Sequence, residues 1–144
     1  MNSSSKITRL TIGSDKSEPF NLLGIVTSEP DYTISLRINK KTGIALRHSD
    51  EEISTGTEND RVSFSLFTTP DNSYALVANK SEKKFLINKL NKIDFLFIQR
   101  SGYSSNFTDL VKTIRSIEGV TAVFVFNSAE VKERNIDLIR HLAQ

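Results

Sequence analysis

The sequence predicts an α+β fold, in which a mainly antiparallel sheet of five or six strands carries two or three helices on one face. Three observations support this class. Residues 92–127 have the pattern strand, helix, strand, and residues 61–77 have the pattern of a hairpin. The chain of 144 residues is 38% hydrophobic and 25% charged, which is typical of an ordinary globular domain. We therefore expect a single domain over residues 1–144.

The strand–helix–strand unit begins with a dense apolar segment, 93–98, rich in aromatic and β-branched residues. This composition is typical of a strand that is buried on both faces. Ser105 or Asn106 can cap the helix that follows, and Gly119 suits its end. The apolar residues of this helix recur at helical spacing: Phe107, Leu110, Val111, Ile114 and Ile117. Residues 120–126 have the composition of a second strand, and two strands joined by one helix predict a right-handed parallel crossover.

The first part of the chain predicts a polar tail and two strands. Residues 1–5 are expected to be loose. A short strand with imperfect alternation is expected at 7–12, and a second strand is expected at 20–27.

Residues 30–40 carry two conflicting signals. Ser28 and Pro30 indicate a helix start, with a serine cap and a proline in the first turn. Residues 32–38 alternate apolar and polar side chains, as a strand does. The stop signal at Gly43 favours the helix, so we expect a helix here, with a strand as the alternative.

A short strand is expected at 44–48. The acidic segment 49–60 has no apolar periodicity and is expected to form an exposed, mobile loop. Residues 61–67 alternate cleanly, residues 74–77 do so less strictly, and the Pro, Asp and Asn residues between them suit a turn. The two segments therefore predict a hairpin.

The remaining segments are a basic connection and a final helix. Residues 80–91 are rich in lysine, and one helical turn is expected within them. Ser128 can cap the final helix. The apolar residues of that helix recur at a helical period, with Ile136 alongside: Val131, Leu138, Ile139 and Leu142.

The chain lacks the residue patterns of common catalytic and metal sites. It has no cysteine, which removes disulfides, zinc-thiolate sites and thiol nucleophiles. His48 and His141 stand in no pattern that marks a catalytic triad or a metal site, and no glycine-rich phosphate loop is present. We therefore expect no enzymatic activity, no catalytic residue, no metal and no cofactor.

Nothing in the sequence predicts a membrane partner or secretion. No apolar run reaches the roughly 20 residues that cross a bilayer, and residues 1–6 contain no apolar leader segment. The absence of cysteine agrees with a reducing compartment. The expected location is therefore the cytoplasm.

Asp94 is the most unusual single residue, because it stands inside a strand that otherwise has a buried composition. An unpaired carboxylate in that place would cost several kcal/mol. The functional interpretation is a ligand contact. The structural interpretation, which we favour, is a carboxylate that accepts backbone N–H groups or pairs with a lysine such as Lys92.

Residues 87–95 resemble the signature of the IPExxxVDY family, small Bacteroidota proteins with no assigned function. The spacing is kept, and four positions match or are conservative replacements: Ile87, Ile93, Asp94 and Phe95. Asn88 and Lys89 depart from the proline and glutamate of the signature. The similarity extends over most of residues 20–98. It implies a family and no activity, and no role of the family's glutamate carries over to Lys89.

A second likeness concerns residues 114–125, which look like the helix-to-strand passage of ACT-type regulatory domains. A glycine that ends a helix before a buried strand is common to many ferredoxin-like units, so this likeness bears on the fold alone. As an alternative function it implies a small-ligand sensor, with the ligand at an interface beside Gly102 or Gly119.

The leading functional hypothesis is a non-enzymatic module that binds a protein partner, or a second copy of itself through an unpaired sheet edge. Basic residues outnumber acidic ones over 80–100, and four lysines there are candidate partner contacts: Lys83, Lys84, Lys89 and Lys92. The same segment supports weak nucleic-acid binding as a second alternative. That alternative is weakened by the small net charge of +2 and by the scarcity of aromatic residues that stack on bases.

Overall fold

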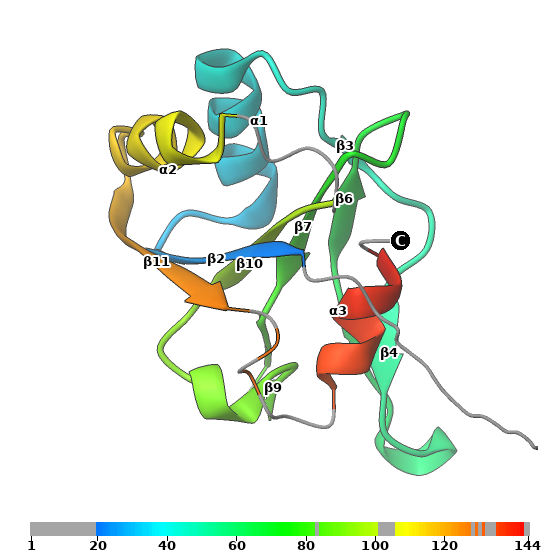
Figure 1. Cartoon of the computed structure of the whole chain (residues 1–144). Helices are drawn as coiled ribbons and strands as arrows, with labels where there is room; N and C mark the ends of the chain where they lie inside the picture. Colours follow the sequence, from blue (N-terminus) through cyan, green and yellow to red (C-terminus); the bar gives the residue numbers. More distant parts are fainter. Residues whose placement is uncertain are drawn as a thin grey trace, which may run out of the picture.

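The centre of the structure, a computed structural model, is a six-stranded sheet of order β11-β2-β10-β7-β6-β3 (Figure 1). The structure describes residues 20–82, 84–100, 106–127, 129, 131 and 135–142. Every neighbouring pair of strands in this sheet is antiparallel. The strand bounds are β2 Asn21–Thr27, β3 Arg47–His48, β6 Leu66–Thr68, β7 Tyr74–Ala78, β10 Phe95–Gln99 and β11 Val120–Asn127. The predicted α+β class with a mainly antiparallel sheet is confirmed.

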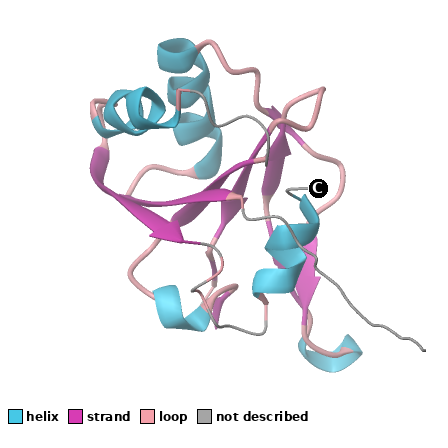
Figure 2. Ribbon diagram, viewed as in Figure 1, coloured by secondary structure: helices cyan, strands magenta, loops and turns pink. Residues whose placement is uncertain are grey.

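Helices cover both faces of this sheet. Helices α1 (Asp31–Thr42) and α2 (Phe107–Arg115) lie together on one face, as Figures 1 and 2 show. Helix α3 (Ile136–Leu142) packs on the opposite face, where Ile136 and Ile139 belong to a separate hydrophobic cluster. Two helices therefore share one face, as predicted, and the third closes the other.

Strand β10 lies between the two cores. All five of its residues are buried. Phe95 and Phe97 contact the cluster under α1 and α2, whereas Leu96 and Ile98 contact the cluster under α3, because successive side chains of a strand point to opposite faces. Full burial of each such side chain is worth about 1.5–3 kcal/mol. The predicted strand buried on both faces is therefore correct.

The predicted strand–helix–strand unit forms, with another strand inserted in the middle of it. Strands β10 and β11 run parallel to each other, but β2 lies between them and is antiparallel to both. Helix α2 joins them, and Gly119 ends the turn into β11 with a φ of 93°. The unit therefore joins two strands on either side of β2.

The helix interpretation of residues 30–40 is confirmed by α1. The Pro30 carbonyl accepts hydrogen bonds from the backbone N–H groups of Thr33 and Ile34. Gly43 closes the helix with a φ of 80°. Residues 32–38 alternate as a strand does because Leu36, an apolar residue, lies on the outer face of α1, where its side chain is 65% exposed.

Residues 53–55 differ from the exposed acidic loop that the sequence predicts over 49–60. They form β4 (Ile53–Thr55), which pairs with β5 (Val62–Phe64) in a small separate sheet. Ile53 is buried in the cluster under α3. A short helical turn, η1 (Glu58–Asp60), connects the two strands. A lone isoleucine among polar residues has no periodicity, which is why the pattern did not reveal this strand.

The predicted hairpin is confirmed for β6 and β7, which pair through Leu66–Val77 and Thr68–Ala75. The preceding segment turns away before Leu66 and supplies β5 to the small sheet. The basic connection contains a second small hairpin and the expected helical turn: β8 Lys80–Ser81, β9 Lys84–Phe85 and η2 Asn88–Leu90. The expected tail at 1–5, the strand at 7–12 and the cap at Ser128 lie outside the described residues.

Candidate functional site

The segment that resembles the family signature is held in place by the buried side chain of Asn79. The Asn79 Nδ2 atom donates to the carbonyl oxygens of Leu90 at 2.9 Å and Ile93 at 3.0 Å. Its Oδ1 atom accepts the backbone N–H of Ile87 at 2.8 Å. The Asn79 side chain therefore fixes the backbone of the segment at three points. The sequence analysis did not identify this role of Asn79.

Three of the four matching signature residues are core residues. Ile87 and Ile93 are buried in the cluster under α3, and Phe95 is buried in the cluster under α1 and α2. None of these three side chains is available to a partner at the surface. The resemblance to the signature thus follows positions that pack the two cores.

Asp94 has two partners. Its Oδ2 atom accepts the backbone N–H of Thr27 at 2.9 Å, and its Oδ1 atom lies 2.8 Å from Lys80 Nζ. The side chain of Asp94 is 19% exposed. This arrangement fits the structural interpretation, with Lys80 as the partner instead of the expected Lys92.

The lysines proposed as partner contacts do not share one environment. Lys84 Nζ lies 2.6 Å from Asp60 Oδ1, so its charge is already paired. Lys89 and Lys92 are exposed, and Lys83 lies outside the described residues. Since Lys80 is paired with Asp94 as well, the positive charge offered to phosphates by residues 80–100 is smaller than the sequence suggests.

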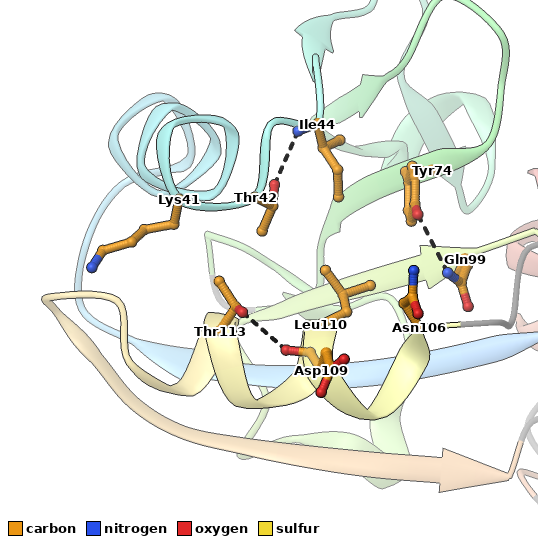
Figure 3. Close-up of a pocket in the computed structure, with 9 residues that line it drawn as sticks. All are labelled: Lys41, Thr42, Ile44, Tyr74, Gln99, Asn106, Asp109, Leu110 and Thr113. Carbon is orange, nitrogen blue, oxygen red and sulfur yellow. Dashed lines mark hydrogen bonds between the residues drawn. The ribbon is translucent and has the colours of Figure 1, made fainter.

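A cleft of about 320 Å³ opens between the end of α1, the start of α2 and the ends of β7 and β10 (Figure 3). Its lining residues come from four separate parts of the chain: Lys41, Thr42, Ile44, Tyr74, Gln99, Asn106, Asp109, Leu110 and Thr113. Two of its lining residues, Gln99 and Asn106, come before and after Gly102 in the sequence, and Gly102 is one of the two places expected for a sensor ligand. Gly102 itself is outside the described residues.

The chemistry of this cleft is that of a small polar binding site. Gln99 is 3% exposed; its Oε1 atom accepts a hydrogen bond from Asn21 at 2.6 Å, and its Nε2 atom donates to the Tyr74 hydroxyl at 3.3 Å. The Asn106 side chain makes no capping hydrogen bond to α2. Among the described residues of the lining, Asp109 is the only carboxylate and no histidine is present. The lining therefore offers hydrogen-bonding groups together with one lysine and one carboxylate.

The two edges of the main sheet differ sharply. The edge strand β3 has two residues, Arg47 and His48, both exposed. The opposite edge strand, β11, has eight residues and no charged side chain. Within the described part of the chain β11 pairs only with β2, and its side chains include exposed Phe124 and Val125. Natural sheets usually guard such an edge with charge, proline or short length, and the described residues place none of these on β11.

The described residues contain no cluster of histidine and carboxylate side chains that could hold a metal ion. No helix in the same part of the chain is long and apolar enough to span a bilayer. The chain matches no family model, no curated protein and no solved structure. The likeness to the IPExxxVDY family stays a prediction.

Proposed function

We propose that this protein is a non-enzymatic cytoplasmic module that pairs with a second copy of itself through the edge of β11 that β2 does not occupy. The observation that carries the proposal is the eight-residue, uncharged edge strand with exposed Phe124 and Val125.

Backbone groups for pairing are present at the middle of β11. Arg115 Nη2 donates a hydrogen bond to the Val123 carbonyl at 3.0 Å, which occupies this carbonyl from outside the ladder with β2. Residues two apart in a strand turn their backbone groups to the same side. The N–H and C=O of Val125 therefore face away from β2 and are the groups available to a new strand.

A second copy suits this edge better than an unlike partner because of symmetry and charge. In a two-fold contact the strand pairs with its own sequence, residue i opposite residue j and j opposite i, so a strand with charges of one sign would repel itself. Strand β11 has no charge to repel. Successive side chains point to opposite faces, so Phe124 and Val125 would extend the apolar surface on both faces of a continuous sheet.

Sedimentation equilibrium with a matched pair of variants tests this proposal. The wild type is expected to show a concentration-dependent dimer, and Val125→Lys is expected to be monomeric, because lysine is the usual guard of an edge strand. Leu36→Lys is the control, since Leu36 is an exposed apolar residue, 65% accessible, that lies on α1 and not on β11. A monomeric wild type at all concentrations, or equal loss of dimer in both variants, would contradict the proposal.

A second candidate function is the sensing of a small polar ligand, which the cleft in Figure 3 supports. A ligand that binds only the native state raises the melting temperature. A panel of polar metabolites is therefore expected to contain one that stabilises the wild type and stabilises Asn106→Ala less. Asn106 suits this test because its side chain caps no backbone group of α2. A panel without any stabilising compound would leave self-pairing as the single function proposed.

A further inference from the structure

A second cavity, basic in character, shares Lys41 with the cleft in Figure 3. It has a volume of about 380 Å³ and lies between the last turns of α1 and the turn that leads from α2 into β11. Five residues line it: Arg37, Lys40, Lys41, Ile117 and Glu118. Among the described residues its lining holds three cations and one carboxylate, and Glu29 beside it pairs with Arg37, which leaves a net surplus of one positive charge.

The cations of this basic cavity are placed by the helix and by a glycine. Arg37, Lys40 and Lys41 are three and four residues apart, which puts them on one face of α1. Arg37 Nη1 donates to the Glu118 carbonyl at 2.6 Å and to Glu29 Oε2 at 3.2 Å. A Cβ atom on Gly119 would lie 2.7 Å from Arg37 Nη1, so the glycine leaves room for the guanidinium. Arg37 is therefore fixed in position before any ligand arrives.

Lys40 and Lys41 have no acidic partner within the described part of the chain. Both are exposed. The helix dipole favours cations in the last turn of a helix, which accounts for two lysines there. The helix dipole does not explain why Arg37 lies one turn earlier, or why the three side chains line one cavity.

We propose that this basic cavity binds the phosphate group of a small organic phosphate. A phosphate monoester carries about 1.5–2 negative charges at neutral pH, and Lys40 and Lys41 are the two cations of the lining without an acidic partner among the described residues. Arginine recognises phosphate through paired N–H groups, and lysine acts as a point charge. The cavity is larger than a bare phosphate ion needs, which favours an organic phosphate over the free ion. The proposal concerns a different surface from β11 and does not rest on self-pairing.

Thermal unfolding and titration calorimetry at constant ionic strength test this site, with glycerol 3-phosphate, inorganic phosphate and sulfate as probes. At 100 times its Kd, glycerol 3-phosphate is expected to raise Tm by about 5–10 °C. It is expected to bind more tightly than inorganic phosphate and sulfate, because both ions lack the organic part.

Two double variants with the same charge change separate the site from general electrostatics. Lys40→Gln with Lys41→Gln is expected to weaken glycerol 3-phosphate at least tenfold while the Tm without ligand stays within about 2 °C. Lys92→Gln with Lys112→Gln, both exposed lysines outside the lining, is expected to change binding less than twofold. Equal weakening by both pairs, stabilisation by sulfate equal to that by glycerol 3-phosphate, tighter binding of inorganic phosphate, or no stabilisation by any probe would overturn the proposal.

Discussion

Replacing Asn79 by alanine removes the side chain that holds residues 86–94 in place. Asn79 is fully buried and makes three side-chain hydrogen bonds, to the backbone of Ile87, Leu90 and Ile93. These three residues lie within the segment that carries the family-like signature. The variant therefore tests whether one amide organises that segment.

The expected loss of stability follows from counting the groups left without a partner. The Leu90 carbonyl keeps a hydrogen bond from the Ile93 N–H at 3.0 Å, so it stays satisfied. The Ile87 N–H and the Ile93 carbonyl lose their partner in a buried environment. Each buried unsatisfied group costs about 1–3 kcal/mol, so Asn79→Ala is expected to lower the free energy of unfolding by about 2–6 kcal/mol. That is a large share of a typical total of about 5–15 kcal/mol.

Urea denaturation followed by circular dichroism measures this loss. A reduction of about 4 kcal/mol corresponds to a fall in Tm of roughly 8–16 °C for a domain of this size. Asn91→Ala is the matched control, because Asn91 is an exposed asparagine in the same segment, and its replacement is expected to change stability by less than about 0.5 kcal/mol. A loss below about 1 kcal/mol for Asn79→Ala, or one no larger than that of the control, would refute the reasoning.

Three further outcomes are expected from the packing and the charges. Asp94→Asn is expected to lower the free energy of unfolding by about 1–3 kcal/mol in urea titrations, whereas Asp60→Asn, in the exposed pair with Lys84, is expected to change it by less than about 1 kcal/mol; equal effects would contradict the structural role of Asp94. Gly24→Ala is expected to cost about 1–3 kcal/mol by overpacking, since its Cβ would lie 2.6 Å from Phe126 Cε2; unchanged Tm would show that the strands adjust freely. Hydrogen bonds from Ser73 and Thr69 lower the pKa of Asp71 from its ordinary value of 3.8, so its contribution to stability is complete above that value and disappears as the pH falls through the lower folded pKa. Melting curves between pH 5 and pH 2 are therefore expected to fall more steeply for the wild type than for Asp71→Asn, and parallel curves would contradict this.

Local signals in the sequence were sufficient for the elements that have clear ends. Helix α1 was predicted from its start signal at Ser28 and Pro30 and its stop at Gly43. Gly43 ends the helix as expected, but the cap position belongs to Pro30 and not to Ser28. The buried character of β10 was visible in the sequence as a run of apolar residues. A strand buried on both faces, as β10 is, has no solvent-exposed face whose polar residues would interrupt such a run. In both cases the information lies within a few residues of chain.

The features that the sequence did not reveal depend on contacts between distant residues. Asn79 follows a strand and has the composition of a turn residue, yet its partners lie up to 14 residues away. Asp94 was expected to pair with Lys92, but successive residues near a strand face different directions, and Lys80 reaches it across the sheet. Neither assignment could be made without knowing which strands are neighbours.

The candidate binding surfaces were equally hidden. The cleft in Figure 3 gathers residues from both helices and two strands, and the basic cavity joins α1 to the turn before β11. The apolar composition of β11 was visible in the sequence, but its place at the sheet edge was not. Strand order is set by the long-range pairing of β2 between β10 and β11, which no local pattern encodes.

Amide hydrogen exchange of β11, measured over a range of protein concentrations, tests the central claim of self-pairing most directly. The Val125 N–H faces away from β2 and is expected to exchange quickly in dilute protein. Its protection is expected to grow with concentration as a second β11 strand pairs with it, while the amides of β10, which are bonded inside one chain, keep constant protection. If exchange of the Val125 N–H does not change with protein concentration, even where the molecules are concentrated enough to contact one another, self-pairing through β11 is contradicted.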